Sequence, residues 1–85
     1  MKLWILSPVK TLQDRDNPWK PWYDKAFGFV VRAETEEEAR RLANEKAGDE
    51  NRYEMRTWLD STYSTCKPLT YEGTPEVVMR DFASA

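Results

Sequence analysis

Cys66 is the side chain of this sequence with the most obvious chemistry, because a cysteine thiolate can act as a nucleophile or a metal ligand. A catalytic thiolate needs a neighbouring base or a strongly positive site that lowers its pKa. The sequence contains no histidine to act as that base. Lys67 is adjacent, but successive residues of a strand point to opposite faces. We therefore expect Cys66 to be a small buried residue, and a single cysteine excludes an internal disulfide.

Carboxylates are the other candidates for catalysis. Asp60 and Asp81 could meet in space, but sequence spacing does not establish the separation that glycoside hydrolysis requires. One cysteine without histidine does not suit a zinc or iron–sulfur site. The glycines are too scattered for a phosphate-binding loop, at Gly28, Gly48 and Gly73. We predict a protein that is not an enzyme and that needs no metal or cofactor.

Residues 17–24, Asn-Pro-Trp-Lys-Pro-Trp-Tyr-Asp, form an aromatic segment interrupted by proline. Proline lacks an amide donor, so the segment is neither helix interior nor central strand, and we predict an ordered loop. Its aromatic rings either close the core or present a binding surface, since Trp and Tyr are frequent interface anchors. Trp22 fits the core-closing role better, whereas Trp19 fits both roles equally. The predicted partner-binding residues of this loop are Trp19, Lys20, Trp22 and Tyr23.

Charge is nearly balanced over the chain, with 13 basic and 15 acidic residues and a net charge of −2. This balance does not favour binding to nucleic-acid phosphates. Residues 34–54 are acidic, with eight acids against four bases. A solvated helix face explains this excess most simply, although it also suits a basic partner. We add Glu37 and Arg41 of this stretch to the predicted partner-binding residues.

Four segments have the pattern of strands: residues 2–7, 25–33, 63–69 and 76–82. In the second, Phe27, Phe29 and Val31 should face the core. Gly28 lies on the other face and leaves a gap that Trp4 could fill. Pro68 places the third segment at a sheet edge.

Residues 35–48 are predicted to form a helix. Thr35 and Glu38 are spaced as a capping box, in which Glu38 reaches back to the Thr35 amide. Gly48 is a typical C-terminal stop. A narrow stripe at helical spacing should pack closely on a sheet; it consists of Ala39, Leu42, Ala43, Lys46 and Ala47.

These elements predict a single α+β domain over residues 1–85. The expected architecture is an antiparallel sheet of three to four strands with one helix packed on one face, in the order β-β-α-β-β. The apolar run of residues 3–6 is too short for a signal peptide or a membrane span. We therefore expect a cytoplasmic protein without a membrane partner.

Two regions of the chain resemble small proteins encoded by phages and prophages. The first is Trp22-Tyr23-Asp24-Lys25-Ala26-Phe27-Gly28-Phe29-Val30-Val31-Arg32-Ala33 with the Glu-rich helix that follows, and the second includes Ser64-Thr65-Cys66 and Val78-Met79-Arg80-Asp81-Phe82. The resemblance covers most of residues 19–45 and 64–82. It implies a bacterial host and a protein that binds a host protein, as inhibitors of host defence such as anti-CRISPR proteins do. It assigns no role to any residue.

The sequence thus favours a non-enzymatic binding module that inhibits or modulates a bacterial host protein, such as a defence complex. Two alternatives stay open. One is a small structural homodimer, paired through the edge strand near residues 63–69. The other is a weak binder of single-stranded nucleic acid, in which aromatic rings stack on bases, although nearby aspartates offset the basic residues.

Overall fold

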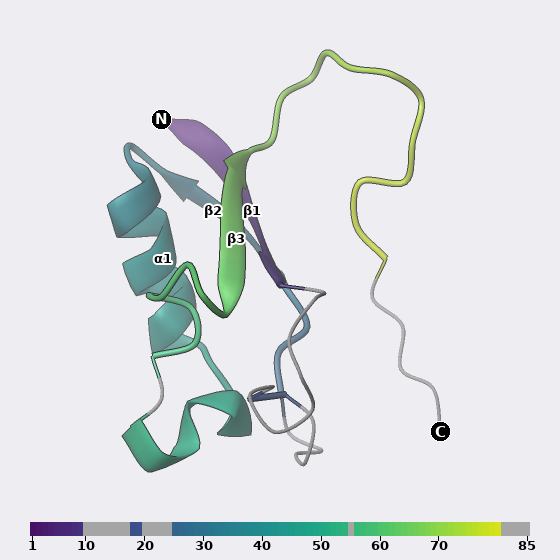
Figure 1. The fold of residues 1–85 in the computed structure, drawn as a ribbon. Helices are drawn as coiled ribbons and strands as arrows, with labels where there is room; N and C mark the ends of the chain where they lie inside the picture. Colours follow the sequence, from purple (N-terminus) through teal and green to yellow (C-terminus); the bar gives the residue numbers. More distant parts are fainter. Residues whose placement is uncertain (10–17, 20–24, 55, 81–85) are drawn as a thin grey trace.

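The structure, a computed structural model, describes residues 1–9, 18–19, 25–54 and 56–80, apart from the side chains of 52–54. A helix and a three-stranded antiparallel sheet form two layers (Figure 1). The elements in chain order are β1 (Lys2–Pro8), β2 (Phe29–Ala33), α1 (Glu36–Glu45), the 3-10 helix η2 (Asp49–Glu54) and β3 (Ser64–Pro68). The predicted α+β class is confirmed.

The sheet has the order β2-β1-β3, so β1 is its central strand. The register places Trp4 opposite Val31 and Leu6 opposite both Phe29 and Cys66. These side chains share the inner face, which α1 covers. The alternate residues form the outer face, which we define as Leu3, Ile5, Ser7, Val30, Arg32, Thr65 and Lys67.

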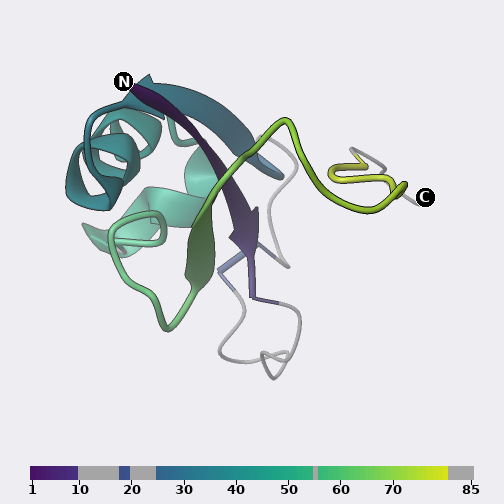
Figure 2. The same ribbon diagram turned by 90° about the horizontal axis from the view of Figure 1, so that it is seen from above.

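The predicted fourth strand is absent from its described part, residues 76–80, which are extended coil; residues 81–82 lie outside the described residues. We call residues 70–80 the C-terminal arm. All of its residues are exposed. Little burial therefore offsets the entropy cost of ordering this segment as a strand in the isolated chain. Seen from above, the arm leaves the sheet on the side opposite α1 (Figure 2).

β2 is shorter than predicted, because it begins at Phe29 and not at Lys25. The amide of Ala26 donates to Oε1 of Glu50 at 2.9 Å instead of to a neighbouring strand. Phe29 and Val31 pack against the core as predicted, whereas Phe27 precedes the strand and is 37% exposed.

α1 begins where the capping pattern predicts. Thr35 is its N-cap and its hydroxyl accepts from the Glu38 amide at 3.2 Å. Glu38 Oε1 accepts from the amide of Glu34, one residue before the predicted Thr35. Ala39 and Ala43 are 0% and 1% exposed, so small side chains let the helix lie close to the sheet.

The helix ends earlier than predicted, at Glu45 with Lys46 as C-cap. Lys46 is exposed, so it does not belong to the buried stripe. The amide of Gly48 donates to Oε2 of Glu50 at 3.0 Å, which places Gly48 in the turn toward η2.

Trp58 lies at the centre of the core and is 0% exposed. Trp19 meets its ring edge-to-face with centroids 5.4 Å apart, and Phe29 does so at 4.8 Å. Such aromatic pairs stabilise beyond the area they bury. The core therefore closes around a tryptophan that lies outside every strand and helix.

Gly28 packs beneath Met79 and not beneath Trp4 as predicted. A β-carbon at Gly28 would lie 2.6 Å from Cε of Met79 and 3.1 Å from the Leu6 carbonyl oxygen. Trp4 instead turns inward, and its indole nitrogen donates to the Ala33 carbonyl at 3.0 Å. The missing side chain at Gly28 thus lets the arm touch the sheet.

Candidate functional site

Trp19 is the aromatic residue of the predicted binding loop that the structure describes, and it is part of the core. It is 5% exposed, and its indole nitrogen donates to the Ala26 carbonyl at 2.8 Å. Nζ of Lys25 donates to the Trp19 carbonyl, also at 2.8 Å. Of the two roles left open for Trp19, the structure therefore shows the core-closing one, and its part in partner binding stays a prediction. Three predicted residues lie outside the described residues: Lys20, Trp22 and Tyr23.

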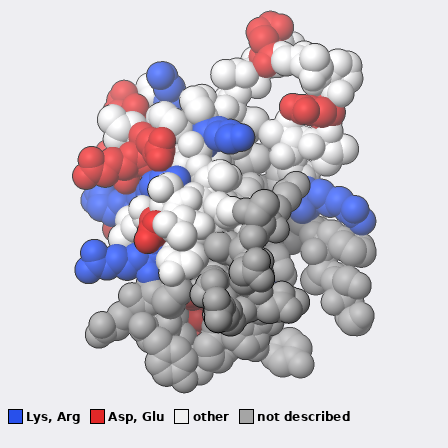
Figure 3. Space-filling view, in the orientation of Figure 1, with Lys and Arg blue, Asp and Glu red and all other residues white. Residues whose placement is uncertain are grey.

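Glu37 and Arg41 are both exposed on α1, away from its buried alanines. Nη2 of Arg41 lies 3.9 Å from Oε2 of Glu38. An exposed pair at that distance contributes little to stability. Acidic and basic side chains lie side by side over the α1 side of the molecule (Figure 3). This face can steer a charged partner.

Glu50 is the most unexpected polar residue of the core, at 0% exposed. Its carboxylate accepts three hydrogen bonds, from the Ala26 amide at 2.9 Å, the Gly48 amide at 3.0 Å and the Trp58 indole at 2.8 Å. Charged groups are tolerated in a core when their hydrogen bonds are satisfied. Glu50 therefore ties the chain before β2, the end of α1 and the central tryptophan together.

Arg40 forms the second half of this buried network and is 7% exposed. Its guanidinium donates to Glu36 Oε2 at 2.9 Å, to the Trp58 carbonyl at 3.0 Å, and to the hydroxyl and carbonyl of Ser64 at 2.9 and 3.1 Å. Within the described part of the chain, every buried side-chain nitrogen and oxygen has a hydrogen-bond partner. The network is saturated, so it has no free group for a ligand.

Neither Glu50 nor Arg40 is among the residues predicted from the sequence. Arg40 follows Glu36 by four positions, the spacing of a helical ion pair, and borders the alanine stripe. That spacing was a usable signal. No local sequence signal predicts the burial of Glu50. Its three hydrogen-bond donors come from a nearby turn and from residues distant in the sequence.

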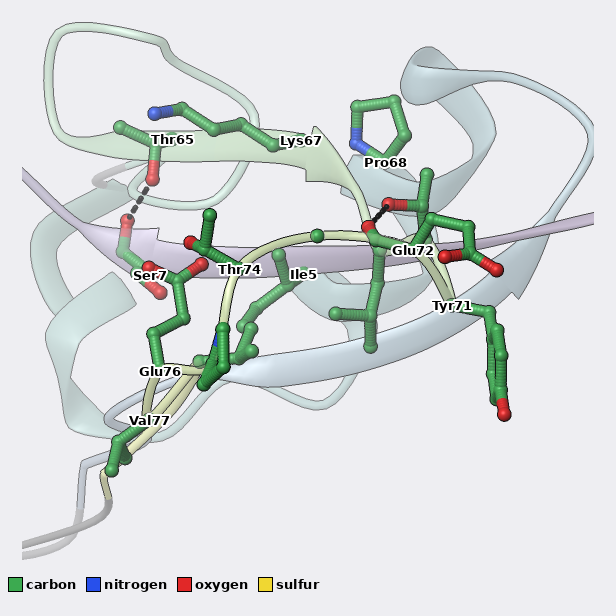
Figure 4. Close-up of a pocket in the computed structure, with 15 residues that line it drawn as sticks. Ile5, Ser7, Thr65, Lys67, Pro68, Tyr71, Glu72, Thr74, Glu76 and Val77 are labelled. Carbon is green, nitrogen blue, oxygen red and sulfur yellow. Dashed lines mark hydrogen bonds between the residues drawn. The ribbon is translucent and has the colours of Figure 1, made fainter.

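A groove lies between the outer face and the C-terminal arm, with a volume of about 580 Å³. Ile5 and Ser7 of β1 and Thr65 and Lys67 of β3 form its floor, and the arm forms its wall. The floor is held in register by the Leu69 amide, which donates to the Leu3 carbonyl at 2.8 Å. Figure 4 shows Ile5 beneath the arm, with Thr65 bonded to Ser7 beside it.

The rim of this groove exposes apolar side chains. Tyr71 is 101% exposed, and its ring points away from the groove (Figure 4). Val77 and Val78 on the arm are 80% and 54% exposed, and Val30 on the outer face is 51% exposed. An accumulation of exposed apolar residues on one side of a protein is typical of a macromolecular interface. Lys67 on the floor and Glu72 and Glu76 on the arm add charges of both signs.

Cys66 and Asp60, which the sequence singles out as candidates for chemistry, do not line the groove. Cys66 lies on the inner face against the core but is only half-buried, less than predicted, and Lys67 points to the opposite face as predicted. Burial raises the pKa of the Cys66 thiol, and the nearby positive charge of Arg40 opposes that shift only in part. The Thr62 amide and hydroxyl lower the pKa of Asp60. Asp81, the carboxylate considered with Asp60 as a catalytic pair, lies outside the described residues.

Among the described residues, no group of three or more His, Cys, Asp or Glu side chains is placed to hold a metal ion. None of the helices in the described ranges has the length and apolar character needed to cross a membrane. Comparison with protein-family models, with curated proteins and with solved structures finds no match to this chain.

Proposed function

We propose that this protein is a non-enzymatic binding module that inhibits or modulates a bacterial host protein, and that it binds its partner with the groove and the outer face. The observation that carries the proposal is the groove of about 580 Å³ with an entirely exposed tyrosine at its rim. An exposed tyrosine beside exposed valines offers apolar area that a partner can bury, and interfaces use Tyr as an anchor.

The form of the groove supports an extended protein segment as its ligand. Its floor is a pleated sheet surface that presents alternate side chains, and its wall is extended coil whose backbone lies outside the sheet. Lys67 on one side and Glu72 on the other can fix the direction of a charged segment. A host protein remains the proposed source of that segment because of the resemblance to phage proteins.

The charged face of α1 serves as a second contact in this proposal. Glu37 and Arg41 are exposed there, on the layer opposite the groove. Charges that lie away from the groove chiefly change the association rate and its dependence on salt. Reversing Glu37 to Lys should therefore slow association at low salt while leaving the dissociation rate nearly unchanged. The three undescribed loop residues stay predicted contacts.

Matched variants test the groove. Wild-type protein is used to capture its partner from a bacterial lysate, and the purified partner is then titrated with Tyr71→Ala and Lys67→Glu. We expect each to weaken binding at least about tenfold, as interface anchors do. The controls are Leu59→Ala and Lys46→Glu, which change an apolar and a basic side chain that are also exposed but do not line the groove. Binding that is equally affected by both pairs, or by neither, would contradict the proposed surface.

Inhibition or modulation is tested separately. The activity of the identified partner is measured with and without this protein, using the Tyr71→Ala variant as the negative control. A change in activity that follows occupancy supports the proposal. Tight binding without any change in activity would reduce the function to binding alone.

A further inference from the structure

The outer edge of β2 carries backbone groups that no neighbouring strand uses. The Leu69 amide pairs with the Leu3 carbonyl, so the odd-numbered residues of β1 bond to β3 and the even-numbered ones bond to β2. Opposite the even-numbered residues lie Phe29, Val31 and Ala33. The amides and carbonyls of Val30 and Arg32 therefore point outward. Within the described residues, no hydrogen bond from another element reaches them.

The outer edge of β3 is different, although β3 was the strand predicted to pair with a second copy. By the same alternation, Ser64, Cys66 and Pro68 point outward there. The Ser64 carbonyl accepts from Arg40, and its amide donates to the Asp60 carbonyl at 3.1 Å. Pro68 has no amide to donate. The outer edge of β3 is thus blocked at Ser64 and lacks a donor at Pro68, which leaves Cys66 between them. On β2, both Val30 and Arg32 offer their amide and carbonyl.

The chain also contains a segment suited to fill an open edge. Residues 76–80, Glu-Val-Val-Met-Arg, have the composition of a strand but are exposed coil. Val77 and Val78 are 80% and 54% exposed. The chain therefore contains both an exposed segment that favours a strand and an unpaired strand edge. Such a segment can pair with such an edge.

The two halves are complementary in one antiparallel register. If Val78 lies opposite Val30, then Glu76 lies opposite Arg32. On the inner side, Val77 then extends the apolar row of Val31. The register thus joins an apolar cross-strand pair to a pair of opposite charges, and both kinds stabilise a sheet. Neither Arg32 nor Glu76 has an ion-pair partner among the described residues.

Within one chain, the arm does not occupy this edge. Its Met79 side chain lies above Gly28, on the outer face of the sheet. Pairing in the register above would require Met79 beside Phe29, in the plane of the sheet and beyond its edge. The arm of the same chain therefore lies over the outer face, and the outer edge of β2 stays open. The arm of a second copy can approach that edge in the plane of the sheet.

We propose that two copies of this chain exchange their C-terminal arms, with residues 76–80 of each pairing antiparallel to β2 of the other. The two exchanged arms are related by a two-fold axis. Each arm and each β2 edge is then occupied, so the assembly stops at a dimer. The β2 edge is distinct from the groove floor, but residues 76–78 line the groove wall within one chain, so exchange removes that part of the wall. The inference does not depend on which host protein is bound.

The proposal is tested by charge reversal. The mass of the protein is measured in solution from micromolar to millimolar concentration for the wild type, Arg32→Glu, Glu76→Arg and the double variant. The wild type should pass from monomer to dimer. Each single variant should weaken dimerisation by about tenfold, since the like-charged pair occurs twice per dimer, and the double variant should restore it. A wild type that stays monomeric throughout overturns the proposal.

A complementation experiment separates arm exchange from other modes of pairing. One chain lacks residues 76–85 and keeps its edge; the other carries Val30→Pro, which removes an outward amide without removing a bond to β1. Neither should dimerise alone, but a mixture should form a heterodimer. Val30→Thr keeps the amide and should dimerise like the wild type. A dimer that survives removal of residues 76–85 would show edge-to-edge pairing instead and would refute the exchange.

Discussion

At the scale of single residues, the fold depends on polar side chains held inside an aromatic core. Glu50 receives three hydrogen bonds, one of them from Trp58. Arg40 binds the backbone of the same tryptophan from the other side. A saturated network of this kind specifies one arrangement of its elements, because each alternative leaves a buried group without a partner. Its members therefore matter more for stability than their solvent-exposed counterparts.

Glu50→Ala should destabilise the protein strongly. The substitution leaves two amides and an indole nitrogen buried without an acceptor, which should cost about 3 kcal/mol of unfolding free energy. Urea unfolding measures this loss, with Glu45→Ala as the exposed control that should change stability by less than about 0.5 kcal/mol. Similar losses for the two variants would show that the network is not a stabilising feature.

Trp19→Ala should also act through stability and not only through binding. The ring is 5% exposed and packs on Trp58, so its removal should cost about 3 to 5 kcal/mol. Tyr71→Ala is the matched control, since its ring is entirely exposed and its loss should leave the unfolding midpoint almost unchanged. A Trp19→Ala protein of wild-type stability would return this residue to the list of surface anchors.

Cys66 should react slowly with alkylating reagents in the folded protein. Burial raises its pKa above the ordinary value of 9.0, so the reactive thiolate forms only at higher pH than in the unfolded chain. Because folding raises this pKa, the folded state favours the neutral thiol. The contribution of Cys66 to the free energy of unfolding is complete below pH 9.0 and is lost as the pH rises through the raised pKa. The pH profile of the alkylation rate, measured with and without urea, tests this shift. Identical profiles would refute it.

At the scale of elements, the contact between α1 and the sheet is set by small side chains. Ala39 and Ala43 are buried against the inner face, and the helix begins at a cap formed by Thr35. Both features follow from local sequence, which explains why the helix was predicted with little error. The close contact leaves no room for a larger side chain at the alanine positions.

Ala43→Leu should therefore overpack this contact and reduce the unfolding free energy by about 1 to 3 kcal/mol. Glu37→Leu places the same side chain on the exposed face of the same helix and should change stability by less than about 0.5 kcal/mol. Thermal unfolding of the two variants gives the comparison. If Ala43→Leu is as stable as the wild type, the helix lies farther from the sheet than the structure shows.

At the scale of the whole molecule, stability is distributed unevenly between the sheet and the arm. β1 is hydrogen-bonded on both sides, whereas residues 70–80 are exposed throughout. Hydrogen exchange in dilute solution should find the slowest amides in β1 and near-intrinsic rates in the arm. Protection of residues 76–80 should then rise with protein concentration if the arms exchange. Strong protection of the arm at high dilution would show that it pairs within its own chain.

The sequence by itself determined the elements whose signals are local. The capping residue Thr35, the alanine stripe, the apolar runs of β1 and β2 and the proline at the end of β3 each act within a few residues, so α1 and three strands could be predicted. The absence of histidine and the alternation of a strand predict Cys66 as a small buried residue, and the structure places it half-buried on the inner face.

Tertiary structure alone decided which polar and aromatic residues are buried and where the site lies. Trp19 enters the core because Trp58 is there to meet it, and Glu50 is buried because three separate donors converge on it. The arm stays outside the sheet although its residues favour a strand. In the monomer, too little apolar surface is buried to offset the entropy cost of ordering it. Long-range contacts of this kind have no local signature, since each depends on residues that only folding brings together.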